Sequence, residues 1–84
     1  MKVKRKEEIL DCLFFDKSMS KLKNYKDIVY FLNAKRFSET NNGIILEVNY
    51  SFISVPDKSY VIKNSDNSIL VCDKDMFFNQ FDIM

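Results

Sequence analysis

Apolar residues gather in three runs in the second half of the chain, at residues 44–54, 59–63 and 68–72, and they alternate with polar residues over 46–52. The runs are rich in β-branched and aromatic residues, and alternation with a period of two is typical of half-buried strands. Residues 56–58 separate the first two runs and residues 65–67 the last two, and both stretches hold residues that favour turns. The pattern therefore predicts a three-stranded antiparallel meander.

Before the meander, apolar residues recur at the spacing of two helices. The first helix is predicted over residues 4–16, with an apolar side made of Ile9, Leu10, Leu13 and Phe14. The second is predicted to begin near Asn24, which is a good N-cap residue. Its apolar side is made of Tyr25, Ile28, Val29 and Leu32.

Two further elements flank the meander. Asn42-Gly43 is a strong hairpin signal, so residues 36–40 either pair with the first run as a fourth strand, with Phe37 across from Val48, or form a plain connection. After the meander, Phe77 and Phe81 stand four residues apart within residues 73–84. This spacing predicts a short helix, with Asp73 or Asp75 as its cap.

Together these elements predict one α+β domain that spans residues 1–84. Two N-terminal helices pack on one face of a three- or four-stranded antiparallel meander, and a short helix ends the chain. A length of 84 residues fits a single domain, and an apolar content of 46% can build its core without staples. We therefore expect Cys12 and Cys72 to be free thiols.

Three-residue turns at 56–58 and 65–67 set the register of the meander. Phe52 then faces Ile62, Ile62 faces Leu70, and Tyr60 faces Cys72. All the even-numbered apolar residues share one side in this register, which makes that side the predicted core face. They are Leu46, Val48, Tyr50, Phe52, Tyr60, Ile62, Leu70 and Cys72.

The odd-numbered face of the meander carries an apolar row as well. Ile53 is predicted to lie opposite Val61, and Val61 opposite Val71, with Ile45 and Ile69 on the same face. If the helices cover only the even-numbered face, this row is exposed. A contiguous apolar patch often marks a contact site, so we predict that these five residues bind a partner protein.

Three phenylalanines near the C-terminus belong to the same candidate site, namely Phe77, Phe78 and Phe81. In one interpretation they fold back over the odd-numbered row and belong to the core. In the other they anchor in a groove of the partner, as helical ligands do.

The composition lacks several residue types that catalytic and metal-binding sites commonly use. The chain has no histidine, a single glycine and two cysteines that stand sixty positions apart. It therefore lacks the commonest general base, a glycine-rich phosphate loop and the ligands of a closed zinc site. We predict that the protein is not an enzyme and binds no cofactor or metal.

The formal net charge is only +1, but residues 1–42 carry ten Lys or Arg against six Asp or Glu. The basic residues that could contact phosphate are Lys2, Lys4, Arg5, Lys6, Lys21, Lys23 and Lys26. Lysine dominates over arginine, and aromatic residues are not interleaved with the basic ones as a stacking platform requires. A solvated charged face is therefore favoured over a nucleic-acid-binding surface.

The sequence predicts a small, cytoplasmic, non-catalytic protein-binding module, with a small nucleic-acid-binding regulator as the alternative. A high content of Phe, Tyr, Ile, Asn and Lys indicates an AT-rich genome. Such a genome suits a phage or mobile-element protein that inhibits or modulates a host factor, for instance a defence nuclease. A protein partner is expected, pairing with a second copy is left open, and no apolar run reaches the length of a membrane span.

Overall fold

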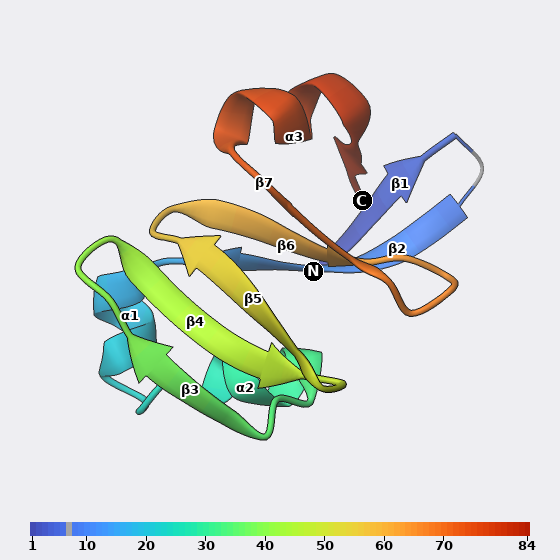
Figure 1. Ribbon diagram of the computed structural model, residues 1–84. Coiled ribbons are helices and arrows are strands. Elements are labelled where there is room, and N and C mark those ends of the chain that lie inside the picture. Colours follow the sequence, from blue (N-terminus) through green and yellow to red (C-terminus); the bar gives the residue numbers. More distant parts are fainter. Residues whose placement is uncertain (7) are drawn as a thin grey trace. The chain divides into compact units, whose positions relative to one another are not determined.

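The protein is mostly β: of the residues that the structure describes, 47% lie in strands and 23% in helices (Figure 1). The computed structural model describes residues 1–6 and 8–84. In chain order the elements are β1 (Lys2–Arg5), β2 (Glu8–Phe15), α1 (Lys17–Lys21), α2 (Lys26–Leu32), β3 (Arg36–Glu39), β4 (Gly43–Val48), β5 (Ser51–Pro56), β6 (Ser59–Lys63), β7 (Ile69–Cys72), α3 (Lys74–Gln80) and β8 (Asp82–Ile83).

The predicted architecture, with two N-terminal helices on one face of a single meander, is wrong. The strands form two antiparallel sheets, and residues 4–16 contribute to β1 and β2 instead of a helix. Leu10 and Cys12 are buried while Ile9 and Asp11 are exposed, which is the two-residue period of a strand. The four residues of the predicted apolar side therefore divide between the two faces of β2, with Ile9 and Leu13 on one and Leu10 and Phe14 on the other. Glu7, which falls within the predicted helix, lies outside the described residues.

The chain divides into two compact units, which are described separately. Unit 1 comprises Met1–Phe14 and Ser59–Met84, and unit 2 comprises Phe15–Lys58. Two units in a chain of this length do not by themselves make two domains, so the single domain stays a prediction.

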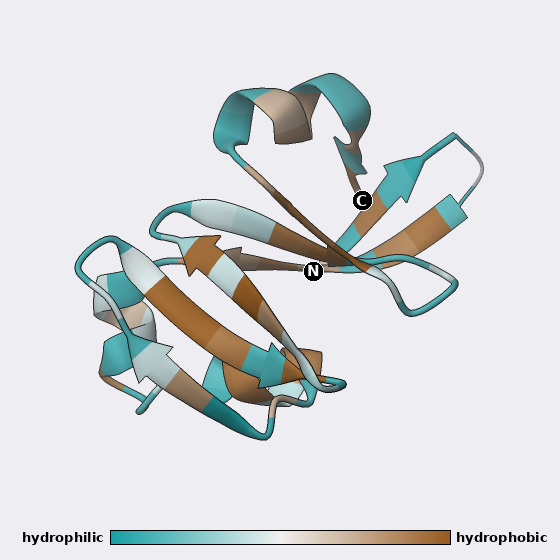
Figure 2. Ribbon diagram, viewed as in Figure 1, coloured by the Kyte–Doolittle hydropathy of each residue, from teal (hydrophilic) through white to brown (hydrophobic). Residues whose placement is uncertain are grey.

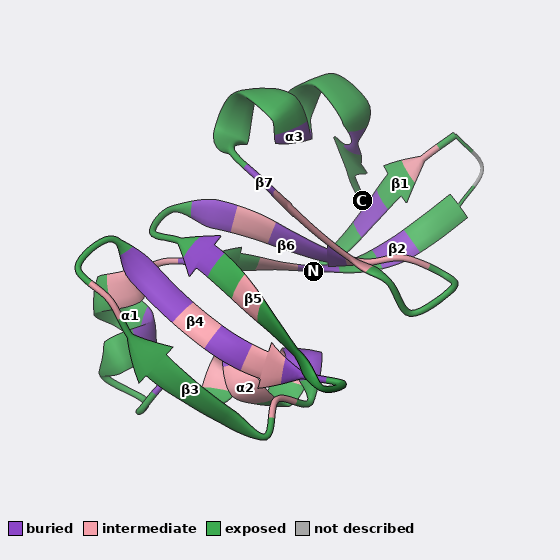
Figure 3. Cartoon of the chain, in the orientation of Figure 1, coloured by how far each residue is buried: buried purple, intermediate pink, exposed green. Residues whose placement is uncertain are grey.

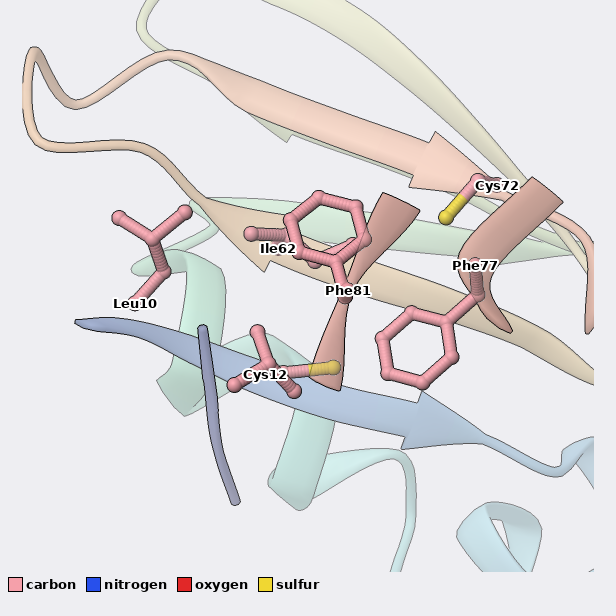
Figure 4. Packing of buried hydrophobic residues seen from close by; sticks show 7 residues of the cluster. Leu10, Cys12, Ile62, Cys72, Phe77 and Phe81 are labelled. Carbon is pink, nitrogen blue, oxygen red and sulfur yellow. The ribbon is translucent and has the colours of Figure 1, made fainter. Parts of the chain in front are cut away.

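Unit 1 is built on a five-stranded sheet with the strand order β7-β6-β2-β1-β8. Its core joins both ends of the chain, and Figure 4 shows how the phenylalanines of the C-terminal segment meet the sheet side chains. The buried members of this core are Val3, Leu10, Cys12, Ile62, Cys72, Phe77 and Phe81. Tyr60 and Leu70 pack against them.

The predicted register of the β6–β7 hairpin is confirmed. Tyr60 pairs with Cys72, Ile62 pairs with Leu70, and Val61 pairs with Val71 on the other face. The predicted C-terminal helix is confirmed as α3, where the Asp73 carboxylate accepts a hydrogen bond from the Met76 amide at 2.8 Å. The Phe77 and Phe81 rings stack with centroids 5.5 Å apart.

Unit 2 holds α1, α2 and a three-stranded sheet with the order β3-β4-β5. The predicted second helix is confirmed as α2, which buries Ile28 and Leu32, but Tyr25 and not Asn24 occupies the N-cap. The Tyr25 ring lies 5.2 Å from the Phe37 ring of β3, which joins the start of α2 to the sheet. The sheet contributes Ile44, Leu46, Val48 and Val55 to the buried side chains of this unit (Figure 3).

The predicted extra strand at residues 36–40 exists as β3, which pairs with β4, but it belongs to a three-stranded sheet and not to a four-stranded meander. Phe37 lies opposite Leu46, however, and not opposite the predicted Val48. The shift of two residues keeps each side chain of β3 on its predicted face, because side chains alternate with a period of two. Gly43 opens β4 where the backbone passes close to Val55, which explains a glycine at this position.

Candidate protein-binding site

The β3-β4-β5 sheet has two faces that differ in chemistry, and the pairing register assigns residues to each. Arg36 pairs with Glu47, and Glu47 with Phe52, so these three side chains share one face. Ser38, Ile45 and Ser54 lie on the same face one pair further along the strands. We call these six residues the outer face, because the buried residues Leu46, Ile44 and Val55 lie on the opposite side.

The run 44–54 was predicted to be one strand, but it is a hairpin that turns at Asn49 and Tyr50. Both residues have positive φ values, 50° and 65°, as a two-residue turn of type I′ requires. The turn reverses the chain, so Phe52 faces Glu47 instead of the predicted Ile62. Phe52 and Tyr50, predicted to be core residues, are consequently 73% and 90% exposed.

A groove of about 300 Å³ opens on this surface. Ile45 and Phe52 from neighbouring strands contribute apolar lining, and Arg36, Ser38 and Glu47 contribute polar groups. Phe37 completes the lining from β3. Figure 2 shows apolar residues along much of β4 and β5 and more polar residues along β3. The groove can therefore take an apolar side chain and offer hydrogen bonds around it.

Arg36 and Glu47 form an ion pair across the outer face. The Arg36 Nε donates a hydrogen bond to the Glu47 Oε1 at 2.8 Å. The Glu47 side chain is only 12% exposed, whereas the Arg36 side chain is 79% exposed. The pair thus fixes the polar border of the groove while leaving the guanidinium accessible to a partner. Beside it, the Lys35 ammonium lies 5.1 Å from the centroid of the Tyr50 ring.

A second charged group lies at the other end of β3. The Lys17 and Lys21 ammonium groups approach the Glu39 carboxylate at 3.6 and 3.3 Å, and Lys17 also donates a hydrogen bond to the Thr40 carbonyl. Behind them, burial and the nearby Glu39 charge raise the pKa of Tyr25. Among the described residues no hydrogen bond of ordinary geometry reaches the Tyr25 hydroxyl, although Glu39 is close. This group ties α1 to the end of β3.

The structure does not bring the predicted protein-binding row together. Ile45 lies on the outer face of unit 2, but Ile53 lies on the opposite face, across from Leu46. The predicted pairing of Ile53 with Val61 is therefore wrong, because the turn at residues 49 and 50 moves Ile53 to the core side. Val61 is fully buried in the sheet of unit 1, where Ile69 and Val71 are half-buried.

The three C-terminal phenylalanines divide between core and surface. Phe77 and Phe81 are buried in the core of unit 1, on the even-numbered face and not over the predicted odd-numbered row. Phe78 is 50% exposed and meets the Phe77 ring edge-on at 5.1 Å. Only Phe78 of the three presents a surface that a partner could contact.

The basic residues of the nucleic-acid alternative belong to different units. Lys2, Lys4, Arg5 and Lys6 lie in or next to β1 of unit 1, whereas Lys21, Lys23 and Lys26 lie in unit 2. Two of them already contact other residues of unit 1. Lys2 pairs with Asp11, and the Arg5 guanidinium donates to Asn64 at 3.0 Å and lies over the Phe81 ring. Nucleic-acid binding stays a prediction.

Sequence reasoning missed Phe52 and Arg36 as surface residues of one site. Two features could have found them. The run of eleven residues is about twice the length of a typical strand, and Asn49 in its middle is a residue that tolerates the left-handed conformation. Both features argue for a turn inside the run.

The two thiols of the chain are buried and free. Burial raises the pKa of Cys12 to about 11, with a smaller contribution from the nearby Cys72, and burial also raises the pKa of Cys72. A nucleophilic cysteine needs the opposite shift. Within residues 1–6 and 8–84, no group of three or more cysteine and acidic side chains is placed to hold a metal ion. Over the same residues, the helices are too short to cross a membrane.

No protein-family model, curated protein or solved structure matches this chain.

Proposed function

We propose that the chain is a small, non-catalytic protein-binding module and that the outer face of the β3-β4-β5 sheet is its docking surface. The observation that carries the proposal is the exposure of Phe52 beside the groove. A phenylalanine left in water forgoes about 1.5–3 kcal/mol of burial free energy, which a partner can recover.

The composition of the outer face supports this role. Aromatic residues and arginine are enriched in the centres of protein interfaces, and Phe52 and Arg36 provide one of each. Glu47 holds the Arg36 side chain through the ion pair, so less rotational freedom is lost when a partner binds. The expected partner places an apolar side chain in the groove between Ile45 and Phe52.

Affinity purification from the organism that encodes the chain tests the proposal, with three forms of the protein compared in parallel. The Phe52→Ser variant should lose the partner that the wild type captures. The control is Tyr30→Ser, which removes an aromatic residue that is 78% exposed on α2 and does not line the groove. Equal capture by the wild type and Phe52→Ser, or equal loss in both variants, would contradict the proposal.

The identity of the captured protein also tests the more specific role that composition suggests. Inhibition of a host factor by a phage or mobile-element protein requires that the partner be such a factor and lose activity when bound. A structural protein as the partner would contradict the inhibitory role and leave the docking surface in place.

A further inference from the structure

We infer that the outer edge of β3 accepts an extended, acidic segment of the partner protein as an additional strand. This inference deepens the proposed function and rests on it, because the segment would run beside the groove of the outer face. Strand addition at an exposed sheet edge is a common way of binding peptides, in which backbone hydrogen bonds give affinity and side-chain pockets give selectivity.

β3 is an edge strand whose outer side has no neighbouring strand in the described part of the chain. All four of its residues are exposed, as Figure 3 shows. The Thr40 amide donates to the Gly43 carbonyl at 3.0 Å, so Thr40 points toward β4. Because backbone groups alternate along an antiparallel ladder, those of Phe37 and Glu39 point away from β4. In the free protein water can satisfy these exposed groups, and another extended backbone can replace that water.

The open row is short, and its limits are visible in the structure. At its start, the Lys35 amide donates inward to the Glu47 carbonyl at 2.9 Å, so the open groups begin after Arg36. At its end, Lys17 donates to the Thr40 carbonyl. An added segment therefore forms its main hydrogen bonds with Phe37 and Glu39, and we expect weak binding that needs side-chain contacts as well.

Charge decides which side chains the added segment should carry. Four cations lie around β3, namely Lys17, Lys21, Lys35 and Arg36, against the three carboxylates of Glu39, Glu47 and Asp57, the last of which accepts a hydrogen bond from the Lys17 amide at 2.8 Å. The surplus of positive charge favours an acidic segment. In an added strand, side chains on one face reach the groove and those on the other lie near Phe37 and Glu39. Apolar residues in the groove and acidic residues toward Lys21 complement both faces.

A second copy of the chain fits this edge less well. Antiparallel pairing of two β3 strands about Ser38 would satisfy the open groups, but it would place Phe37 opposite Glu39 of the other copy. It would also bring two positively charged neighbourhoods together, and like charges across strands are destabilising. The occupant is therefore a different segment and not β3 itself.

Titration of the ¹⁵N-labelled protein with two blocked peptides tests the inference, one alternating aspartate with valine and the other lysine with valine. The aspartate peptide should shift the amide signals of Phe37 and Glu39, and the lysine peptide should bind at least tenfold more weakly. No shift with the aspartate peptide at millimolar concentration would overturn the inference. Shifts of the same signals with protein concentration alone would also overturn it, because they would identify a second copy as the occupant.

Two substitutions at Glu39 distinguish whether the backbone amide or the charge of this residue is needed for peptide binding. Glu39→Pro removes an outward amide that β4 does not use, whereas Glu39→Gln removes the charge and keeps the amide. The proline variant should lose peptide binding at least tenfold, and the glutamine variant should keep it. Retained binding by a folded proline variant would overturn the inference.

Methylated peptides give the same test without altering the protein. Amide methylation on every aspartate or on every valine blocks opposite edges of the added strand. One methylated form should lose binding and the other should keep it, and equal behaviour of the two forms would overturn the inference. If the edge fails these tests while Phe52→Ser still loses the captured partner, the docking surface stands without strand addition. Retention of the partner by Phe52→Ser would instead refute the proposed function.

Discussion

Phe52 lies directly opposite Glu47 in the β4–β5 hairpin, which places its ring on the outer face of the sheet beside the Arg36–Glu47 ion pair. Phe52 is the one aromatic residue among the six of the outer face, and it lies next to the charged groups that border the groove. This pairing also separates the docking surface from the buried residues that stabilise unit 2, so the two can be altered independently.

Phe77 and Phe78 are neighbours in sequence with opposite surroundings, and this makes them a matched pair. Phe77 is fully buried, and its ring stacks on Tyr60 with centroids 3.8 Å apart. Phe77→Ala should lower the free energy of unfolding by about 3–5 kcal/mol, because it leaves a cavity in the core of unit 1. Phe78→Ala should cost about 1 kcal/mol or less. Urea unfolding measures both, and equal losses would contradict the packing of α3.

Gly43 stands where a side chain does not fit. A Cβ atom at this position would come within 2.1 Å of the Val55 carbonyl oxygen and 2.8 Å of the Pro56 Cα, both of which are backbone atoms. Gly43→Ala should therefore destabilise the protein by about 1–3 kcal/mol, as overpacking does. The control is Asn42→Ala at an exposed position, and thermal unfolding compares the two variants. A Gly43→Ala protein as stable as the wild type would show that β4 and β5 are not this close.

Asp16 should make unfolding depend on pH in the acid range. Its hydrogen bond with Lys58 lowers the pKa of the carboxyl to about 2, with help from Ser18 and the Met19 amide at the start of α1. The unfolded chain, with an aspartate pKa of about 3.9, binds more protons in this range. The stabilisation is therefore complete above about pH 4 and is lost as the pH falls toward 2.

The substitution Asp16→Asn isolates this effect, because asparagine still caps a helix but does not titrate. Unfolding free energies measured by urea between pH 2 and 5 should rise with pH less steeply in the variant than in the wild type. Identical slopes for the two proteins would show that Asp16 is not paired with Lys58 in solution.

Cys12 should resist alkylation until the protein unfolds. A rise of its pKa from 9.0 to about 11 lowers the thiolate fraction about 100-fold at neutral pH, and burial adds a steric barrier. Iodoacetamide labelling followed by mass spectrometry should find slow modification in buffer and rapid modification in urea. Labelling at the same rate in both conditions would place Cys12 on the surface.

The correct predictions concern elements that are determined by residues close together in the sequence. The β6–β7 hairpin was correct because Asp66 and Asn67 favour a turn between two short runs rich in β-branched residues. The α3 helix and its Asp73 cap were correct for a similar reason. The presence of β3 followed from Asn42-Gly43, although the register was two residues off.

The wrong predictions concern strands whose pairing has no local signal in the sequence and a turn of unusual sequence. The spacing of Ile9, Leu10, Leu13 and Phe14 fits one side of a helix, but the pairing of β2 with β1 overrides this local preference. The β1–β8 pairing joins the two ends of the chain and has no local signal. Tyr50 adopts a left-handed conformation that usually indicates glycine or asparagine, so the turn that exposes Phe52 was hidden.

Both proposals require the turn at Asn49 and Tyr50, because only that turn places Phe52 on the outer face. The most direct measurement is a nuclear Overhauser effect between the Hα atoms of Glu47 and Phe52. Glu47 and Phe52 are a pair that exchanges no backbone hydrogen bonds, and in such a pair the two Hα atoms lie close together. We therefore expect a strong effect. Absence of this effect, together with contacts from Phe52 to Ile62, would contradict the account and restore a continuous strand over residues 44–54.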